Sequence, residues 1–187
     1  MILVLAVVLG LLASLVRHRG CTFQRIAALR LHWASLALLA VVLQVPLLRA
    51  PMDLVRNLRV QQALFLASYL LLLVFVWRNR RLAGILIVGV GVVLNLLAIV
   101  ANRGFMPITT ETLVEINPGS TPGQWPEGFH YGFSKDVIHA RQDTKLWALS
   151  DILVVSPPFP WPMAFSVGDL VLAFGIVVLL QGSPART

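Results

Sequence analysis

Five apolar runs, separated by basic or polar residues, make up most of the chain. They lie at about residues 1–16, 31–48, 62–77, 82–101 and 163–180. An α-helix needs about 20 mainly apolar residues to cross the hydrocarbon core of a bilayer, and several of these runs approach that length. The pattern predicts an all-α integral membrane protein, in which a bundle of five transmembrane helices forms a single membrane domain over residues 1–187.

The fourth run has small and polar side chains on one face. Steps of three and four residues along a helix place on this face Gly84, Gly91, Asn95 and Asn102. Glycines let a second helix approach closely, and an asparagine in hydrocarbon needs a hydrogen-bonding partner. We therefore expect this run to be the central helix and to pack through this face.

Residues 104–162 form a long hydrophilic segment, which is typical of a functional or docking region. Its first half is rich in proline and glycine and predicts turns. Between Lys135 and Val155, apolar residues such as Leu146, Leu149 and Ile152 predict one or two short helices on the outer membrane surface. The sequence thus predicts a structured exoplasmic loop that carries short surface helices.

The composition agrees with a membrane protein, because 58% of the residues are hydrophobic and 12% are charged. The charged share is about half of that in an average soluble domain. The net charge is +7, but the arginines lie at the ends of the apolar runs and not on an aromatic-rich surface. This distribution argues against nucleic-acid binding.

The arginines also predict an orientation. With five spans, the inner segments contain Arg17, Arg19, Arg25, Arg30, Arg78, Arg80, Arg81 and Arg186. The acidic residues, including Asp53 in the second loop, fall in outer segments or at the outer end of the last run. Because lysine and arginine of short loops favour the cytoplasmic side, we expect a bacterial plasma membrane protein with its N-terminus outside and its C-terminus in the cytoplasm.

Asp169, at the start of the last run, is the main candidate for chemistry. An acidic residue at the mouth of a transmembrane helix can act as an intramembrane acid or base. Ser166 and Asp169 also have the S-x-x-D spacing of a capping box, which satisfies the free N–H groups of a helix start and suits the helix dipole. The capping role alone is the simpler interpretation, and both stay open from the sequence.

The last two runs resemble the final helices of lipoprotein signal peptidases. That family has an F-N-x-A-D motif, in which Asp169 would match the second catalytic aspartate while Ser166 and Gly168 replace the asparagine and the alanine. The run through Asn95 resembles the family's G-x-x-x-N-x-x-D, but Ala98 stands at the position of its first aspartate. Two aspartates that share a proton and activate water are the family's mechanism, so the resemblance does not carry that chemistry over.

Three segments resemble a family of uncharacterised bacterial membrane proteins of about this length. Its motifs A-N-x-G-x-M-P, D-T-[KR]-L-W-x-L-x-D and S-x-G-D correspond to residues 101–107, 143–151 and 166–169. This resemblance covers nearly the whole chain. It implies membership of an uncharacterised family and no particular activity.

A second acidic residue could complete a site of different origin. If the outer segment folds over the mouth of the bundle, Asp151 could meet Asp169 and form an acid–base pair. In the simpler alternative, Asp143 and Thr144 cap a short helix and Asp151 faces solvent.

No metal or cofactor is expected from the sequence. The single cysteine, Cys21, excludes an intrachain disulfide and a cysteine metal cluster. His130 and His139 are nine residues apart, which fits no common zinc spacing. His32 could ligate a haem, but no histidine in another run would complete a bis-histidine pair.

Because no complete catalytic set is present, the sequence favours an accessory or structural subunit of a larger bacterial membrane complex. Its partners would be the lipid bilayer and other membrane subunits, and not nucleic acid. The alternative is an intramembrane aspartate-dependent hydrolase, in which Asp169 and Asp151 act on a lipid-linked or extracytoplasmic substrate.

Overall fold

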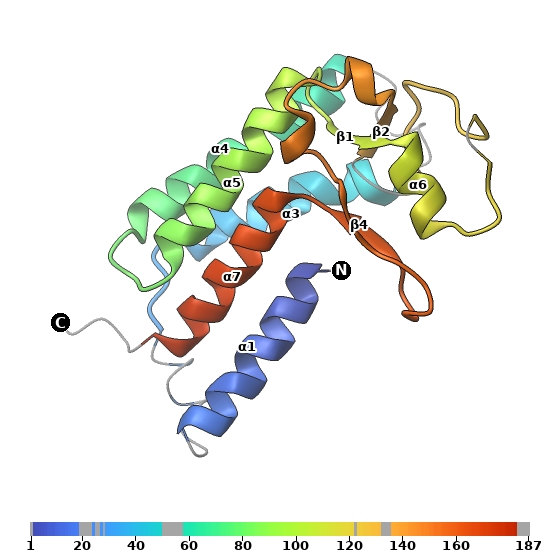
Figure 1. Ribbon diagram of the computed structural model, residues 1–187. Helices are drawn as coiled ribbons and strands as arrows, with labels where there is room; N and C mark the ends of the chain where they lie inside the picture. Colours follow the sequence, from blue (N-terminus) through green and yellow to red (C-terminus); the bar gives the residue numbers. More distant parts are fainter. Residues whose placement is uncertain are drawn as a thin grey trace.

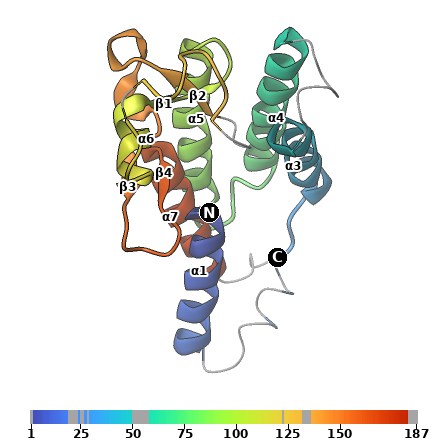
Figure 2. The ribbon, with the colours of Figure 1, turned by 90° about the vertical axis from the view of Figure 1, so that its right-hand side faces the viewer.

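The computed structural model describes residues 2–18, 24, 27, 29–49, 58–121, 123–131 and 136–182. In these residues five long helices lie side by side (Figure 1, Figure 2). They are α1 (Ile2–His18), α3 (Ala34–Arg49), α4 (Leu58–Arg78), α5 (Ile85–Ala101) and α7 (Val167–Gln181). The packing order is α1, α7, α5, α4 and α3, so α5 and α7 are direct neighbours although they are far apart in the sequence. Cys21 and Asp53 lie outside the described residues.

Glycines bring α5 and α7 into backbone contact. Gly84, in a left-handed conformation (φ +80°) just before α5, lies against Gly175 of the antiparallel α7, and Gly91 lies against Gly168. A Cβ atom on Gly91 would come within 2.6 Å of the Gly168 carbonyl oxygen, so only a residue without a side chain fits there. The glycine face of α5 therefore fixes which helix is its neighbour and how closely the two approach.

The segment between α5 and α7 folds over one end of the helices (Figure 1). It contains strand β1 (Met106–Thr109), helix α6 (Thr110–Ile116), strand β2 (Asp136–His139), the 3₁₀ turns η1 (Arg141–Asp143) and η2 (Trp147–Leu149), and strands β3 (Leu153–Val155) and β4 (Met163–Phe165). β1 pairs in parallel with β2, and β3 pairs antiparallel with β4. Ile108, Leu113 and Ile138 form a small buried core between β1, β2 and α6. We call this segment, residues 104–165, the cap.

The expected bundle of five transmembrane helices is wrong. Of the helices in the described part of the chain, only α4 is long and apolar enough to cross a membrane. The other four have 15 to 17 residues, or about 22–26 Å at 1.5 Å per residue, against a hydrocarbon core of about 30 Å. The apolar runs extend beyond the helices because α5 starts only after Gly84, and α7 starts only after Ser166.

A helix of this length and composition occurs both as a membrane span and as the core helix of a soluble protein. Nevertheless, the helical positions along the chain agree closely with the apolar runs. What is wrong is the step from an apolar run to a complete span.

The expectation of surface helices between residues 135 and 155 is also wrong in part. Residues 136–139 form the strand β2, which lies beside β1 with Val137 and Ile138 buried, and residues 153–155 form β3. Helical structure there is restricted to the two three-residue turns η1 and η2. Pairing with the distant residues 106–109 stabilises β2. The apolar periodicity within residues 135–155 gives no information about that pairing.

Candidate functional site

A cavity of about 850 Å³ lies where the helices meet the cap. Side chains of α1, α3, α4, α5 and α7 line it from the helical side, and residues of α6, β1, β2 and β4 line it from the cap. Three carboxylates are among these side chains, those of Asp136, Asp151 and Asp169. We call this space the carboxylate cavity.

Asp169 lines the cavity from the first turn of α7 and belongs to a closed hydrogen-bond network. Its Oδ1 accepts a bond from Asn95 Nδ2 at 2.7 Å, and the Asn95 Oδ1 accepts a bond from Ser166 Oγ at 2.8 Å. The backbone N–H of Asp169 in turn donates to Ser166 Oγ at 2.9 Å, and the Ser166 N–H donates to Asp169 Oδ2 at 3.4 Å. Asp169 is thus both a helix cap and a side chain held in one orientation from α5.

The local sequence explains why this network forms. Ser166 has an extended backbone and caps α7, and Ser166 and Asp169 form the reciprocal bonds of a capping box. Gly168 lies between them, and a Cβ atom at this position would overlap the side-chain amide of Asn95. The missing side chain at Gly168 therefore lets the amide of Asn95 reach Ser166 and Asp169.

Asp151 enters the cavity from the cap. It follows the turn η2, which ends where Ser150 Oγ donates to the Trp147 carbonyl oxygen at 2.6 Å. Its backbone N–H donates to the Pro107 carbonyl oxygen of β1 at 3.2 Å. Only 2% of Asp151 is exposed. The simpler interpretation of the sequence, in which Asp151 faces solvent, is therefore wrong. Asp151 and Asp169 thus line the same cavity from two separate segments.

Asp136 is a third carboxylate that sequence reasoning did not single out. It is the first residue of β2, it is buried, and it lies opposite Met106 of β1. The sequence predicts a loop before it and a surface helix after it, and neither element implies a buried side chain. The parallel pairing of β1 with β2 is what carries Asp136 to the cavity.

The rest of the cavity wall is mainly apolar. Phe65, Tyr69 and Leu72 of α4 line one side, and Phe165 and Leu172 line another. Polar groups other than the carboxylates include Asn117, whose Nδ2 donates to the hydroxyl oxygen of Tyr131 at 2.7 Å. An apolar wall with a few polar groups is typical of a site for an amphipathic small molecule.

The other residues singled out from the sequence lie outside this cavity. Gly84 and Gly91 form the contact between α5 and α7. Asn102 holds the cap on α5, because its Oδ1 accepts a bond from the Lys145 N–H at 2.9 Å and its Nδ2 donates to the Lys145 carbonyl oxygen at 2.7 Å. Gly84, Gly91 and Asn102 have structural contacts and no contact with the carboxylates.

Asn102 also lines a second, smaller cavity of about 310 Å³, together with Arg103 and His139. Burial lowers the pKa of the His139 imidazole below its ordinary value of 6.5, and the positive charge of Arg103 lowers this pKa further. Glu127 and Asp143 act in the opposite direction.

The three carboxylates do not converge on a metal position. Within the described residues, no group of three or more histidine, cysteine, aspartate or glutamate side chains is arranged to hold a metal ion. The arrangement provides instead carboxyl groups at the edge of an apolar space, and such groups can serve in acid–base catalysis or hydrogen-bond to a bound molecule.

Comparison with known proteins gives a family and no activity. No curated protein and no solved structure matches this chain. The model of a family of unknown function, DUF5317, matches residues 28–181, which include α3, α4, α5, the cap and α7. The expectation of an uncharacterised family is in agreement with this match. The chain therefore belongs to the DUF5317 family of unknown function.

Proposed function

We propose that this protein is an aspartate-dependent hydrolase that acts on an amphipathic, lipid-linked or extracytoplasmic substrate bound in the carboxylate cavity. One observation carries the proposal: Asp151 and Asp169, from the cap and from α7, line the same cavity. Acidic side chains grouped in a cavity of this size are a common feature of active sites.

The two aspartates have different surroundings, which suggests different roles. Asp169 accepts hydrogen bonds from Asn95 Nδ2 and from the Ser166 N–H, which hold its side chain in one orientation, so we assign it the role of general base. Asp151 enters the cavity from the cap, on a separate segment, so we assign it the role of general acid.

The reaction follows from these roles. Asp169 takes a proton from a water molecule while the water oxygen attacks the carbonyl carbon of an ester or amide. Asp151 gives its proton to the leaving oxygen or nitrogen as the bond to the carbonyl carbon breaks. The products are a carboxylic acid and an alcohol or amine, and transfer of a proton from Asp169 to Asp151 restores the starting state.

The cavity wall supports this type of substrate. Phe65, Leu72 and Leu172 offer an apolar surface to a hydrocarbon chain, while the carboxylates face its polar end.

In this proposal α4 anchors the protein in the bacterial plasma membrane. It is long and apolar enough to span, and Arg78, Arg80 and Arg81 follow at its C-terminal end. In this proposal the end of α4 at Arg78 faces the cytoplasm, and the cap, with the carboxylate cavity, lies on the outer side.

The test detects hydrolysis without requiring that the substrate be identified first. Purified protein in a mild detergent is incubated with a lipid extract of bacterial membranes in water enriched in the heavy oxygen isotope. Hydrolysis inserts one heavy oxygen atom into a product, and mass spectrometry detects it. The variants are Asp169→Asn and Asp151→Asn, and Asp143→Asn is the control because Asp143 is exposed and outside the cavity.

We expect both cavity variants to remain folded and to lose labelling by at least about 100-fold, the lower end of the usual contribution of acid–base catalysis. Asp143→Asn should label like the wild type. An extract without labelled products, or labelling that persists in Asp169→Asn, would contradict the hydrolase proposal.

A second candidate is the accessory or structural subunit of a larger membrane complex, which a different observation favours. Large apolar side chains are exposed on the outer faces of the helices, for example Val4 of α1 (63%), Leu38 of α3 (66%) and Phe174 of α7 (60%). Exposed apolar surface of this extent marks contacts with lipid or other proteins. Purification from the native membrane in a mild detergent tests it: stoichiometric protein partners support a subunit, and an isolated monomer contradicts it.

A further inference from the structure

An apolar groove runs along the outer side of α4 and α5. It has a volume of about 650 Å³ and is lined by residues of both helices, including Val76, Trp77, Leu86, Val90 and Val93. The lining contains no charged side chain. Gly89 contributes to its shape, because a Cβ atom there would approach Val76 Cγ1 to 2.7 Å.

The groove is separate from the carboxylate cavity. On α4 the cavity is lined by Phe65, Tyr69 and Leu72, whereas the groove is lined by Leu73 and Val76 among others. The rim of the groove is well exposed, with Trp77 at 68% and Leu86 at 59%. No described element of this chain covers these side chains.

A cluster of arginines adjoins the Trp77 end of the groove. Arg78 is the last residue of α4, and Arg80 and Arg81 are in the turn that connects α4 to α5. All three are exposed. The Arg80 guanidinium lies 4.5 Å from the centre of the Trp77 ring, and its Nη1 donates to the Trp77 carbonyl oxygen at 3.1 Å. Arg78 similarly lies 5.3 Å from the ring of Trp33.

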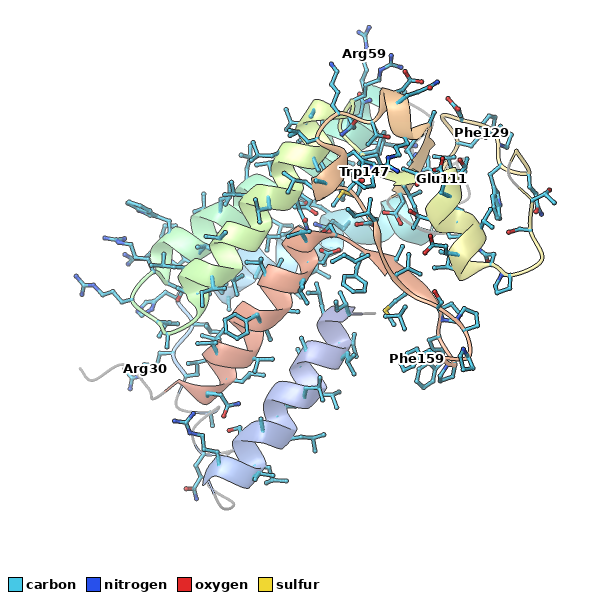
Figure 3. The ribbon with its side chains drawn as sticks, viewed as in Figure 1. Arg30, Arg59, Glu111, Phe129, Trp147 and Phe159 are labelled. Carbon is cyan, nitrogen blue, oxygen red and sulfur yellow. The ribbon has the colours of Figure 1, made fainter. Side chains whose placement is uncertain are left out.

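No acidic residue occurs between residues 58 and 110, so neither helix nor the turn offers a negative charge to these arginines. Arg30 lies at the same end of the helices, whereas Glu111 lies at the opposite end (Figure 3). The apolar groove thus ends at a cluster of positively charged arginine side chains.

We propose that this groove binds an anionic phospholipid, with one acyl chain along α4 and α5 and the phosphate against Arg78, Arg80 and Arg81. The apolar lining accepts a hydrocarbon chain and offers no partner to a polar ligand. Guanidinium groups bind phosphate oxygens in pairs of parallel hydrogen bonds, which fixes the headgroup at the Trp77 end. A transmembrane helix of a partner protein would fill the groove without using the arginines.

The test compares two lipids with identical acyl chains, phosphatidylglycerol and phosphatidylcholine. Each is added to the purified full chain in a neutral detergent, and native mass spectrometry counts the lipids that stay bound. We expect phosphatidylglycerol to bind at least about tenfold more tightly than phosphatidylcholine. The acyl chains of the two lipids make the same contacts with the groove, so the difference comes from the headgroup.

Two kinds of variant distinguish the contribution of the lipid headgroup to binding from that of the acyl chain. Replacing the three arginines by glutamine should remove the preference for phosphatidylglycerol. Val90→Phe should fill the groove and weaken both lipids, whereas Val100→Phe is the matched control, since Val100 is similarly exposed on α5 but does not line the groove. If the triple variant does not fold, the single variant Arg81→Gln gives the same comparison.

Equal binding of the two lipids, or a preference that survives the loss of the arginines, would overturn the proposal. Unchanged binding in Val90→Phe would also overturn it, because the acyl chain would then lie elsewhere. A stoichiometric protein held at this groove in place of lipid would show a partner helix as the occupant. These results do not depend on Asp151 or Asp169, so the hydrolase proposal and the lipid site fail independently.

Discussion

The side-chain amide of Asn95 donates a 2.7 Å hydrogen bond to the carboxylate of Asp169, which is 74 residues away in the sequence. This bond joins α5 to the start of α7 at the point where both helices face the carboxylate cavity. Asn95 is 2% exposed, so its polar atoms depend on protein partners for their hydrogen bonds. The bond therefore couples the packing of the two helices to the orientation of the proposed general base.

Asn95→Ala should destabilise the fold by about 1–3 kcal/mol, because it removes the hydrogen-bonding partner of both Ser166 Oγ and Asp169 Oδ1. The measurement is the free energy of unfolding in a mild detergent. Gln142→Ala, at an exposed position of η1, is the control and should change the stability by less than about 0.5 kcal/mol. Equal stability of Asn95→Ala and the wild type would show that the network contributes nothing.

Gly91→Ala should destabilise the contact between α5 and α7 by about 1–3 kcal/mol, because its Cβ atom would be forced against the Gly168 backbone. Gly10→Ala in α1 is the matched comparison. There the Cβ atom would come closer than 3.0 Å only to Leu180 Cδ1 (2.7 Å), the end of a side chain that can move, whereas Val177 Cα at 3.4 Å is at ordinary contact distance. The helix also gains up to about 1 kcal/mol in propensity. Thermal unfolding of the two variants should thus give opposite shifts, and a similar loss in both would contradict the close approach of α5 and α7.

Asn102→Ala should release the cap from the end of α5. The change removes both hydrogen bonds to the Lys145 backbone and the bond from Nδ2 to the Ala98 carbonyl oxygen. We expect faster hydrogen exchange around residues 141–151, while α4 and α7 keep their protection. A uniform increase over the whole chain would instead indicate global destabilisation.

His139 should make the stability depend on pH below neutrality. Its pKa in the folded protein is below 6.5, so the unfolded chain binds a proton more readily. The contribution of His139 is therefore fully present above pH 6.5 and is lost as the pH falls through the lower pKa of the folded state.

The check is the unfolding midpoint between about pH 7.5 and about pH 5, the range around the histidine pKa. His139→Gln should reduce the loss of stability on acidification relative to the wild type. A pH dependence that is identical in His139→Gln and the wild type would contradict this assignment.

The positions of the long helices could be predicted from the sequence, since apolar runs and helices coincide along the chain. The lengths of these helices could not be predicted. The run at residues 82–101 loses its first residues to the left-handed conformation of Gly84, and the run at residues 163–180 loses its first residues to β4. Apolar composition does not distinguish a helix from the strand or turn that precedes it, and this is why the fourth and fifth runs do not form complete spans. The first and second runs correspond to helices of 17 and 16 residues, which are themselves short for a span.

The parts of the candidate site that depend on local interactions were predictable from the sequence. The spacing of Ser166 and Asp169 indicates a capping box, and the glycine and asparagine face of α5 indicates a close helix contact. Asp136 was missed because its place at the cavity depends on pairing between β1 and β2, which are about 30 residues apart in the chain.

The measurement that tests the central claim most directly is the incorporation of heavy oxygen into products of a bacterial membrane lipid extract by the wild type and by Asp169→Asn. Asparagine keeps one acceptor oxygen at this position but turns an NH2 group toward one of the two N–H donors that Asp169 accepts from, so the base is lost together with one hydrogen bond. We predict a folded protein with a lowered unfolding midpoint and a loss of labelling of at least about 100-fold. Equal labelling by the two folded proteins would show that Asp169 is a helix cap alone and would contradict the hydrolase account.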